Sequence, residues 1–415
     1  EVLAEVAQLN EQGLRVLGVS YKSNLEEGYA FEVADEADMT LTGYLAFLDP
    51  PNPSAAPAIN ILAEYGVATK ILTGDNEKVT QAVCEKVGLD VDRILLGSDI
   101  DSLSDPELAQ AVETTTVFAK LSPDQKARII LQLKANGHKV GYMGDGINDA
   151  PSMKVADVGI SVDTAVDIAK ETADVILLDK DLMVLEKGLV EGRKVYANMT
   201  KYIKMTVSSN FGNIFSLLFA SIFLPFLPMA PIHLIVLNLV YDLSCIALPF
   251  DRVDKDFLKK PRIWEAKSIT RFMAWFGPIS SVFDILTFII LYFVIVPMIT
   301  GYGYVHGADS AGLFIMLFQT GWFIESMWSQ TMVIYMLRSP KLPFVQSRPA
   351  FAVMATTLLG ALLVTFLPYG PLASLLKVAP LNALYFLLLA GILFLYMASV
   401  TLVKHYYIGK YKEWL

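Results

Sequence analysis

Long apolar stretches dominate the second half of the chain. A helix that crosses a bilayer needs about 20 mostly apolar residues. Six stretches meet that need, at about 205–225, 231–250, 272–299, 313–336, 350–368 and 381–403. A single stretch of this kind also occurs in buried helices of soluble proteins, but six in series favour a membrane domain. The pattern therefore predicts an all-α transmembrane domain of six helices over residues 196–415.

The first half shows a different pattern, in which short apolar runs alternate with helical periodicity. The runs lie at 41–48, 67–72, 116–119, 139–143, 158–162 and 174–178, and the helical patterns lie at about 54–65, 77–87, 123–136 and 149–155. This alternation is typical of an α/β domain, with a Rossmann-like parallel sheet covered by helices. We place this domain at 46–195, treat 1–45 as part of a separate domain, and expect a helical stalk from about 181 to 204.

Composition and charge strengthen the division into two halves. The 415 residues are 54% hydrophobic and only 18% charged, with a mean hydropathy of +0.47, whereas soluble proteins carry about 25% charged residues. Residues 1–200 hold 33 acidic and 17 basic side chains, a net of −16; residues 201–415 hold 9 and 16, a net of +7. The acidic first half argues against nucleic-acid binding, and two cysteines provide no disulfide framework.

Basic residues predict the orientation in the membrane. The loops at 251–271 and 337–349 and the C-terminal tail together carry thirteen lysines and arginines, whereas the opposite loops carry only Lys377. Cytoplasmic loops are enriched in Lys and Arg. We therefore expect residues 1–200 and the C-terminus to be cytoplasmic.

One motif of the first half carries a strong chemical signal. The string Met143-Gly-Asp-Gly-Ile-Asn-Asp-Ala-Pro151 follows an apolar strand and precedes a helix, and ligands of open α/β sheets bind at such strand ends. Asp145 and Asp149 supply the hard oxygen ligands that hold Mg²⁺ beside a phosphate, and Asn148 is able to hydrogen-bond a phosphoryl oxygen. A Gly/Asp-rich turn without function is the alternative for a bare Gly-Asp-Gly.

Two further segments fit the same sheet edge. Thr73-Gly74-Asp75 ends an apolar strand, and Ser122-Pro-Asp-Gln-Lys126 begins a helix after another strand. Ser122 is expected to cap that helix, with Pro123 at its first position. Lys126 then lies one turn inside, where its charge would neutralise a phosphate. Taken singly, such segments are more often structural, as a turn or a solvated lysine, but their order and their placement at strand ends beside the 144–151 motif favour the functional interpretation.

The order of these motifs resembles the C-terminal half of a P-type ATPase. The resemblance covers nearly the whole chain, through TGDN at 73–76, SPDQK at 122–126 and GDGINDAP at 144–151, followed by a long helix and six spans. It implies a haloacid-dehalogenase-like phosphorylation domain that uses ATP and Mg²⁺. It also implies that residues 1–45 end a nucleotide-binding domain, and that the phosphoryl site is formed by Thr73, Gly74, Asp75, Lys126 and Asn148, with Asp145 and Asp149 as the Mg²⁺ ligands.

The chain also departs from that family. The phosphorylated aspartate of the family lies in a DKTGT motif, which does not occur in these 415 residues, and the family's TGE motif is absent too. We expect the chain to be part of a larger pump whose N-terminal part is its partner, and to be inactive alone. A membrane regulatory protein with an inactive phosphatase-like domain is the alternative, although the intact Lys126, Asp145 and Asp149 argue against it. Homo-oligomerisation stays open.

Polar residues within the spans indicate a cation site, because charges are costly in a bilayer. In the family, the first two of these spans form the ion site, and Asn210, Asn213, Asn238 and Asp242 match its motifs. Asp284 joins this predicted site, and Glu325 ranks lower because Ser326, Ser329 and Gln330 lie near enough in sequence to satisfy it. Tryptophans and tyrosines of the spans are interpreted as interface and packing residues.

One aspartate among amides suits a partly hydrated Mg²⁺, which uses fewer carboxylates than Ca²⁺. The segments FIESMWSQ (323–330) and SPKLPFVQSRPA (339–350) resemble the bacterial magnesium-importing branch of the family. The resemblance thus implies an inner-membrane protein that imports Mg²⁺. A P-type pump for H⁺ or Ca²⁺ remains the alternative.

Overall fold

The computed structural model describes residues 2–22, 32–48, 50–179, 181–308 and 310–414. It divides into two compact units, Glu1–Leu189 and Val190–Leu415. The boundary falls inside α9 (Met183–Phe223), one continuous 41-residue helix. The expected stalk that runs into the first span is therefore confirmed.

The first unit begins with α1 (Val2–Glu11) and the antiparallel strands β1 (Leu14–Tyr21) and β2 (Thr40–Leu48). The register of this pairing shifts between Val19 and Ser20, where a bulge interrupts it. A short 3₁₀ turn, η1 (Val33–Asp35), precedes β2.

The rest of this unit contains six short parallel strands, which form two three-stranded sheets, and the helices between them. One sheet has the order β3 (Ile71–Leu72), β5 (Val117–Ala119), β4 (Ile94–Leu96), and the other β6 (Gly141–Met143), β7 (Val158–Val162), β8 (Val175–Leu177). Leu72 of β3 and Val140 beside β6 each pack against both hydrophobic cores of the unit. The edges of the two sheets thus share side-chain packing, and the expected parallel α/β fold is confirmed.

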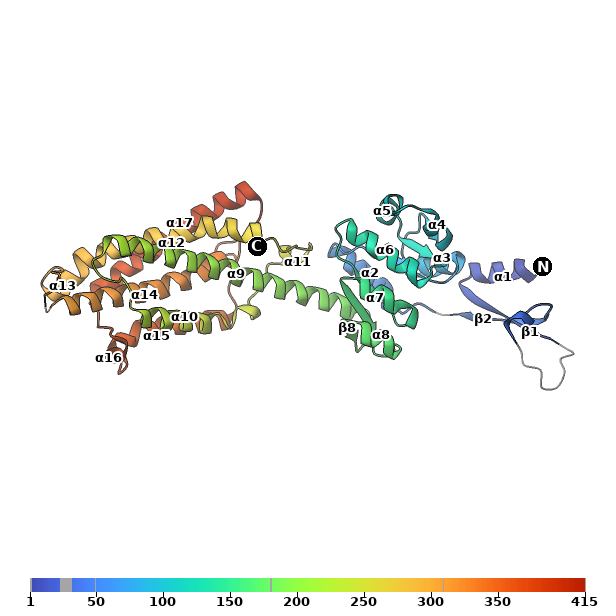
Figure 1. Ribbon diagram of the computed structural model, residues 1–415, viewed down its shortest axis with the longest axis horizontal. Helices are drawn as coiled ribbons and strands as arrows, with labels where there is room; N and C mark the ends of the chain where they lie inside the picture. The colour runs from blue at the N-terminus through green and yellow to red at the C-terminus, as the bar shows by residue number, and fades with distance from the viewer. Residues whose placement is uncertain (1, 23–31, 49, 180, 309, 415) are drawn as a thin grey trace. The chain divides into compact units, whose positions relative to one another are not determined.

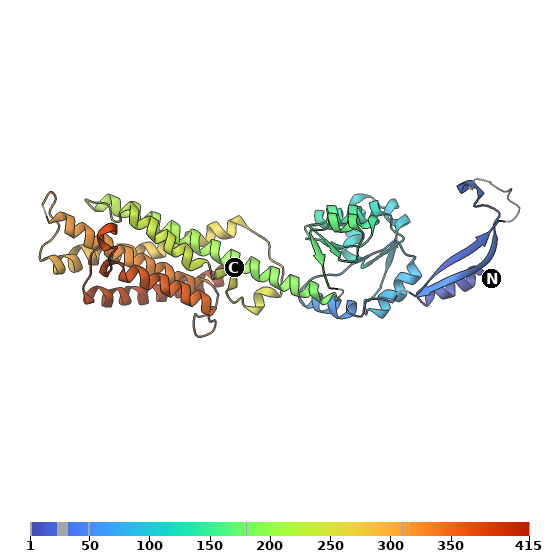
Figure 2. The same ribbon diagram turned by 90° about the horizontal axis from the view of Figure 1, so that it is seen from below.

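Helices surround these strands (Figure 2). They are α2 (Ala55–Glu64), α3 (Glu77–Lys86), α4 (Gly97–Ser102), α5 (Asp105–Thr114), α6 (Pro123–Ala135), the 3₁₀ turn η2 (Ile147–Asp149), α7 (Ala150–Val155) and α8 (Asp167–Thr172). Asn76 caps α3 by accepting from the Val79 N–H. Ser122 caps α6 by accepting from the Gln125 N–H, with Pro123 at the first position, so the predicted cap is confirmed.

The second unit is a bundle in which long helices run beside one another (Figure 1). After α9 come α10 (Pro231–Cys245), η3 (Leu248–Phe250), α11 (Lys255–Leu258), α12 (Ala266–Ile290), the π-helical η4 (Leu291–Ile295), α13 (Val296–Thr300), α14 (Ala311–Leu337), α15 (Phe351–Phe366), η5 (Leu367–Tyr369), α16 (Ala373–Leu376) and α17 (Ala383–Tyr411).

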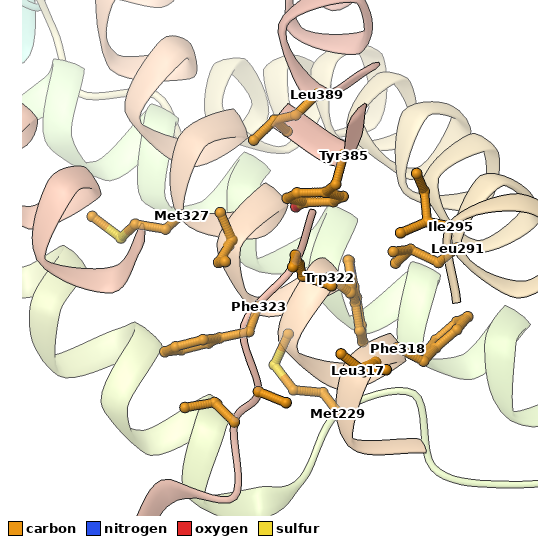
Figure 3. Close-up of a cluster of buried hydrophobic side chains, with 14 of the residues drawn as sticks. Met229, Leu291, Ile295, Leu317, Phe318, Trp322, Phe323, Met327, Tyr385 and Leu389 are labelled. Atoms are coloured by element: carbon orange, nitrogen blue, oxygen red, sulfur yellow. The ribbon is translucent and has the colours of Figure 1, made fainter. Parts of the chain in front are cut away.

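Within the part of the chain that the structure describes, five helical segments are long and apolar enough to cross a membrane. They match five of the six predicted spans. The sixth, 313–336, lies in α14, which is long enough but carries polar residues such as Gln319, Glu325 and Gln330 that lower its mean hydropathy. Most of α14 is buried, and its Trp322 and Phe323 lie within the main hydrophobic cluster of the bundle (Figure 3). A helix that faces protein rather than lipid tolerates such residues.

Glycines allow α9 and α12 to approach closely. A Cβ added at Gly212 would lie 2.8 Å from the carbonyl oxygen of Gly277, and one at Gly277 would lie 2.6 Å from the Phe211 ring. Ser281 Oγ donates to the Gly212 carbonyl across the same contact, at 3.0 Å. Small residues thus fix the packing of these two helices.

A buried ionic cluster joins the ends of several helices in this unit. Asp251, just after η3, accepts from Lys201 Nζ of α9 at 3.1 Å and from Arg338 Nε beyond α14 at 2.8 Å. It also accepts from the Ala350 N–H at 3.0 Å. The three charged side chains are at most 2% exposed. Burial disfavours the charged carboxylate, but the two cations outweigh it and lower the pKa of Asp251.

Candidate functional site

The motif 144–151 forms the turn between β6 and α7. Gly144 donates from its N–H to the Ile160 carbonyl at 3.1 Å, and its own carbonyl accepts from Ser161 Oγ at 2.9 Å. The Asp145 carbonyl accepts from the Val166 N–H. The side chains of Asp145 and Asn148 are exposed. The backbone of the motif is therefore hydrogen-bonded to β7 and to the start of α8. The Asn148 carboxamide and the Asp145 carboxylate remain accessible to a ligand.

Asp149 lies at the centre of a small polar network. Its Oδ1 accepts from Lys126 Nζ at 2.9 Å and from the Tyr142 hydroxyl at 2.7 Å, and its Oδ2 accepts from the Gly146 N–H at 3.3 Å. The Lys126 and Asp149 side chains are 11% and 14% exposed. Burial opposes the charged form, but the bonds from Lys126 and Tyr142 prevail and lower the pKa of Asp149. Two residues that the sequence assigned to one site are thus in direct contact.

The Thr73-Gly74-Asp75 segment lies at the end of β3, on the strand that neighbours β5. Thr73 exchanges backbone bonds with Phe118 and Leu121, each at 3.0 Å. Its hydroxyl donates to Asp75 Oδ2 and accepts from the Asp75 N–H, both at 3.1 Å. Asp75 also forms an ion pair with Arg15 of β1. The side chains of this segment are engaged with one another and with the hairpin.

The donor set fits a magnesium ion in part. Asp145 and Asp149 provide hard carboxylate oxygens, and Asp149 Oδ2 keeps only one long hydrogen bond. Among the residues that the structure describes, no group of three or more His, Cys, Asp or Glu side chains is suited to a metal. Mg²⁺ commonly takes one or two carboxylates and completes its shell with water and phosphate oxygens, so a pair of aspartates suffices beside a phosphoryl group.

Gly144 is required by close packing against Asp149. A Cβ at Gly144 would lie 2.4 Å from the Asp149 Cβ, whereas one at Gly146 would lie 3.6 Å from the nearest atom, Asp149 Oδ2. We expect Gly144→Ala to displace Asp149 and to lower the stability of this unit by about 1–3 kcal/mol. Gly146→Ala is the matched control and should cost much less. Thermal unfolding of the full-length protein checks this; equal midpoints for the two variants would contradict it.

The predicted intramembrane residues fall into two groups. Asn210, Asn238 and Asp242 are exposed on α9 and α10, and Asn213 is half-buried. Asp284 of α12, by contrast, is 1% exposed. Asn210, Asn238 and Asp242 thus have exposed side chains, whereas the Asp284 side chain is buried.

Asp284 and Glu325 lie within the bundle. Asp284 accepts from Ser216 Oγ at 2.6 Å and from Trp322 Nε1 at 3.0 Å. Glu325 of α14 is also 1% exposed. Both Glu325 oxygens are buried and have no hydrogen-bond partner among the described residues. Of the three neighbours expected to satisfy Glu325, Ser329 donates to the Ser326 carbonyl, and Ser326 Oγ and Gln330 Nε2 have no hydrogen-bond partner among the described residues.

Comparison with known proteins shows which family the chain resembles in each half. Residues 7–157 match the family of haloacid dehalogenase-like hydrolases, and residues 226–406 match the C-terminal domain of cation-transporting ATPases. The chain is 50% identical, over 97% of its length, to "Magnesium-transporting ATPase, P-type 1" of Salmonella typhimurium strain 14028s and of Escherichia coli strain K12. The chain belongs to the P-type ATPases.

Within this family the chain corresponds to the C-terminal portion, as the resemblance implied. It spans 43% and 44% of the length of the two magnesium-transporting ATPases. It is also 36% identical, over 70% of its length, to a calcium-transporting ATPase of Bacillus subtilis strain 168. P-type ATPases of both kinds are thus relatives, and the magnesium-transporting ones match more of the chain at higher identity.

Sequence reasoning missed three residues that the structure joins to the predicted site residues. Tyr142 reads as one more apolar strand residue, yet it donates to Asp149. Trp322 reads as a packing residue and Ser216 as a small residue of a span, yet both donate to Asp284. The one sequence signal that could have identified Tyr142 as a site residue is its position two residues before the Gly-Asp-Gly turn.

Proposed function

We propose that this chain carries the phosphorylation domain and six transmembrane helices of an ATP-driven pump that imports Mg²⁺ across the bacterial inner membrane. The observation that carries the proposal is the 50% identity to magnesium-transporting relatives along 97% of the chain. The weaker and shorter match to a calcium-transporting relative supports the choice of cation. The thirteen basic residues on one side support a cytoplasmic phosphorylation domain.

In this proposal, ATP phosphorylates an aspartate outside these 415 residues, in the N-terminal part of the pump. Thr73 and Asn148 hydrogen-bond the phosphoryl oxygens, with Gly74 and Asp75 shaping the turn, and Lys126 neutralises their charge. Asp145 and Asp149 would hold a resident Mg²⁺, which would supply further charge neutralisation when bound. Preorganised charge of this kind is the main source of catalysis in phosphoryl transfer.

The transported Mg²⁺ is assigned to the polar residues of the bundle. Asn210, Asn213, Asn238 and Asp242 would hold a partly hydrated ion on α9 and α10, and Asp284 would act deeper in the bundle. Glu325 stays secondary, although its unpartnered carboxyl makes it a stronger candidate than its neighbours in sequence suggested.

Asp242→Asn tests the assignment, because it removes the charge and keeps the shape. We expect the concentration of Mg²⁺ that half-maximally stimulates the ATPase of the full-length pump to rise at least about tenfold, since a hard cation loses its only carboxylate on these two faces. Asp256→Asn, on an exposed acid outside the spans, is the matched control. Wild-type Mg²⁺ stimulation and uptake by Asp242→Asn would refute the site.

A further inference from the structure

Tyr142 places its hydroxyl against Asp149, one of the two proposed Mg²⁺ ligands. The residue lies in β6 and is 9% exposed, within a core cluster formed with Ile130, Met153, Ala165 and Ala169. A buried tyrosine normally finds a partner for its hydroxyl. Here the partner is Asp149 Oδ1, at 2.7 Å. The ring is therefore held by the core while the hydroxyl reaches the site.

The hydrogen bonds on Asp149 are unequally divided between its two oxygens. Oδ1 accepts from both Tyr142 and Lys126, at 2.7 and 2.9 Å. Oδ2 accepts from the Gly146 N–H at 3.3 Å, beyond the usual range for such a bond. One oxygen is thus fixed, and the other keeps most of its capacity to bind a ligand.

The two donors to Oδ1 differ in how easily they move. Lys126 carries its charge on a flexible four-carbon stem, whereas the Tyr142 ring has two rotatable bonds and is packed in the core. A lysine that turns to a phosphoryl oxygen weakens its bond to Asp149. The neutral hydroxyl of Tyr142 is not drawn to the phosphoryl group in the same way, so its bond to Oδ1 persists.

We propose that Tyr142 is a positioning residue. Its hydroxyl holds the Asp149 carboxylate in place while the Lys126 ammonium group binds the phosphoryl oxygens. The inference rests on the proposed function for the roles of Asp149 and Lys126. It assigns to the strand before the Gly-Asp-Gly turn a part in metal binding, through a side chain that touches neither metal nor phosphate.

Tyr142→Phe removes the hydroxyl and keeps the packed ring, so the variant is expected to fold. Binding of Mn²⁺, used alone as a probe, is measured by electron paramagnetic resonance on the full-length protein carrying Asp242→Asn to suppress the intramembrane site. We expect the Mn²⁺ dissociation constant to rise about tenfold, since loss of an outer-shell partner costs about 10–100-fold in metal affinity or activity. In the ATPase assay, the half-maximal Mg²⁺ concentration should rise while the rate at saturating Mg²⁺ changes little.

Met153→Leu is the matched control, because it alters the same core cluster without touching the hydroxyl. Unchanged Mn²⁺ binding in Tyr142→Phe, or an equal loss in Met153→Leu, would overturn the inference. Unchanged Mn²⁺ binding in Asp149→Asn would overturn both the inference and the assignment of Asp149. The pump could fail to move Mg²⁺ while Tyr142→Phe still raises the Mn²⁺ dissociation constant. That result would refute only the proposal that Mg²⁺ is the transported ion, and it would support the inference about Tyr142.

Discussion

Lys126→Met should lower the steady-state ATPase rate of the full-length pump by about 10²–10³-fold, the cost of losing one preorganised charge-stabilising donor. Among the described residues, Lys126 is the one cation that forms an ion pair with Asp149, and its side chain is mostly buried at the start of α6. Methionine keeps the unbranched length of the stem but removes the charge. Both the phosphoryl group and the Asp149 carboxylate then lose their positive partner.

Lys120→Met provides the comparison, because Lys120 is an exposed lysine of the same unit that pairs with Glu77. ATP hydrolysis at saturating Mg²⁺ is the measurement, and Lys120→Met should hydrolyse ATP at nearly the wild-type rate. A rate in Lys126→Met within a few fold of wild type would show that Lys126 does not act on the phosphoryl group.

Asp251→Asn is the substitution with the largest expected effect on stability. Asp251 is the buried carboxylate that holds Lys201 and Arg338, with all three side chains at most 2% exposed. Removing one member of a buried ion network leaves the remaining charges uncompensated and costs about 3–5 kcal/mol. We expect a marked fall in the thermal unfolding midpoint of the full-length protein in detergent.

Asp254→Asn is the matched variant for this test. Asp254 pairs with Lys341 and accepts from Ser339, but its side chain is 21% exposed and its partner lysine is 41% exposed. Exposed ion pairs contribute about 0–1 kcal/mol, so the unfolding midpoint should fall only slightly. If the two variants unfold at the same temperature, the buried cluster does not stabilise the bundle as the structure indicates.

Much of the fold could be predicted because its elements have strong periodicity or clear signals at their ends. The Ser122 cap and Pro123 define the start of α6, and the apolar runs define β6 and β7. Between residues 88 and 115 the sequence predicted no elements, yet the structure contains β4, α4 and α5. These elements have three, six and ten residues, and the two shorter ones are too short for periodicity to distinguish from a loop.

The candidate site was predictable where chemistry lies at the ends of strands. Lys126 and Asp149 are 23 positions apart, yet each follows a strand of a parallel sheet, and the topology brings them together. Tyr142 and Trp322 were missed because an aromatic residue in a strand or span is normally a packing residue. Whether its polar atom reaches a carboxylate depends on tertiary packing, which no local pattern reveals.

Transport by the purified full-length protein in vesicles shows which cation the pump moves. Vesicles are loaded with Mg²⁺ and a fluorescent Mg²⁺ indicator, and ATP is added outside to the molecules whose phosphorylation domain faces outward. We expect an ATP-dependent loss of Mg²⁺ from the lumen, which Asp242→Asn slows at low lumenal Mg²⁺, and no comparable movement of Ca²⁺. ATP-dependent movement of Ca²⁺ or H⁺ with lumenal Mg²⁺ unchanged would contradict it.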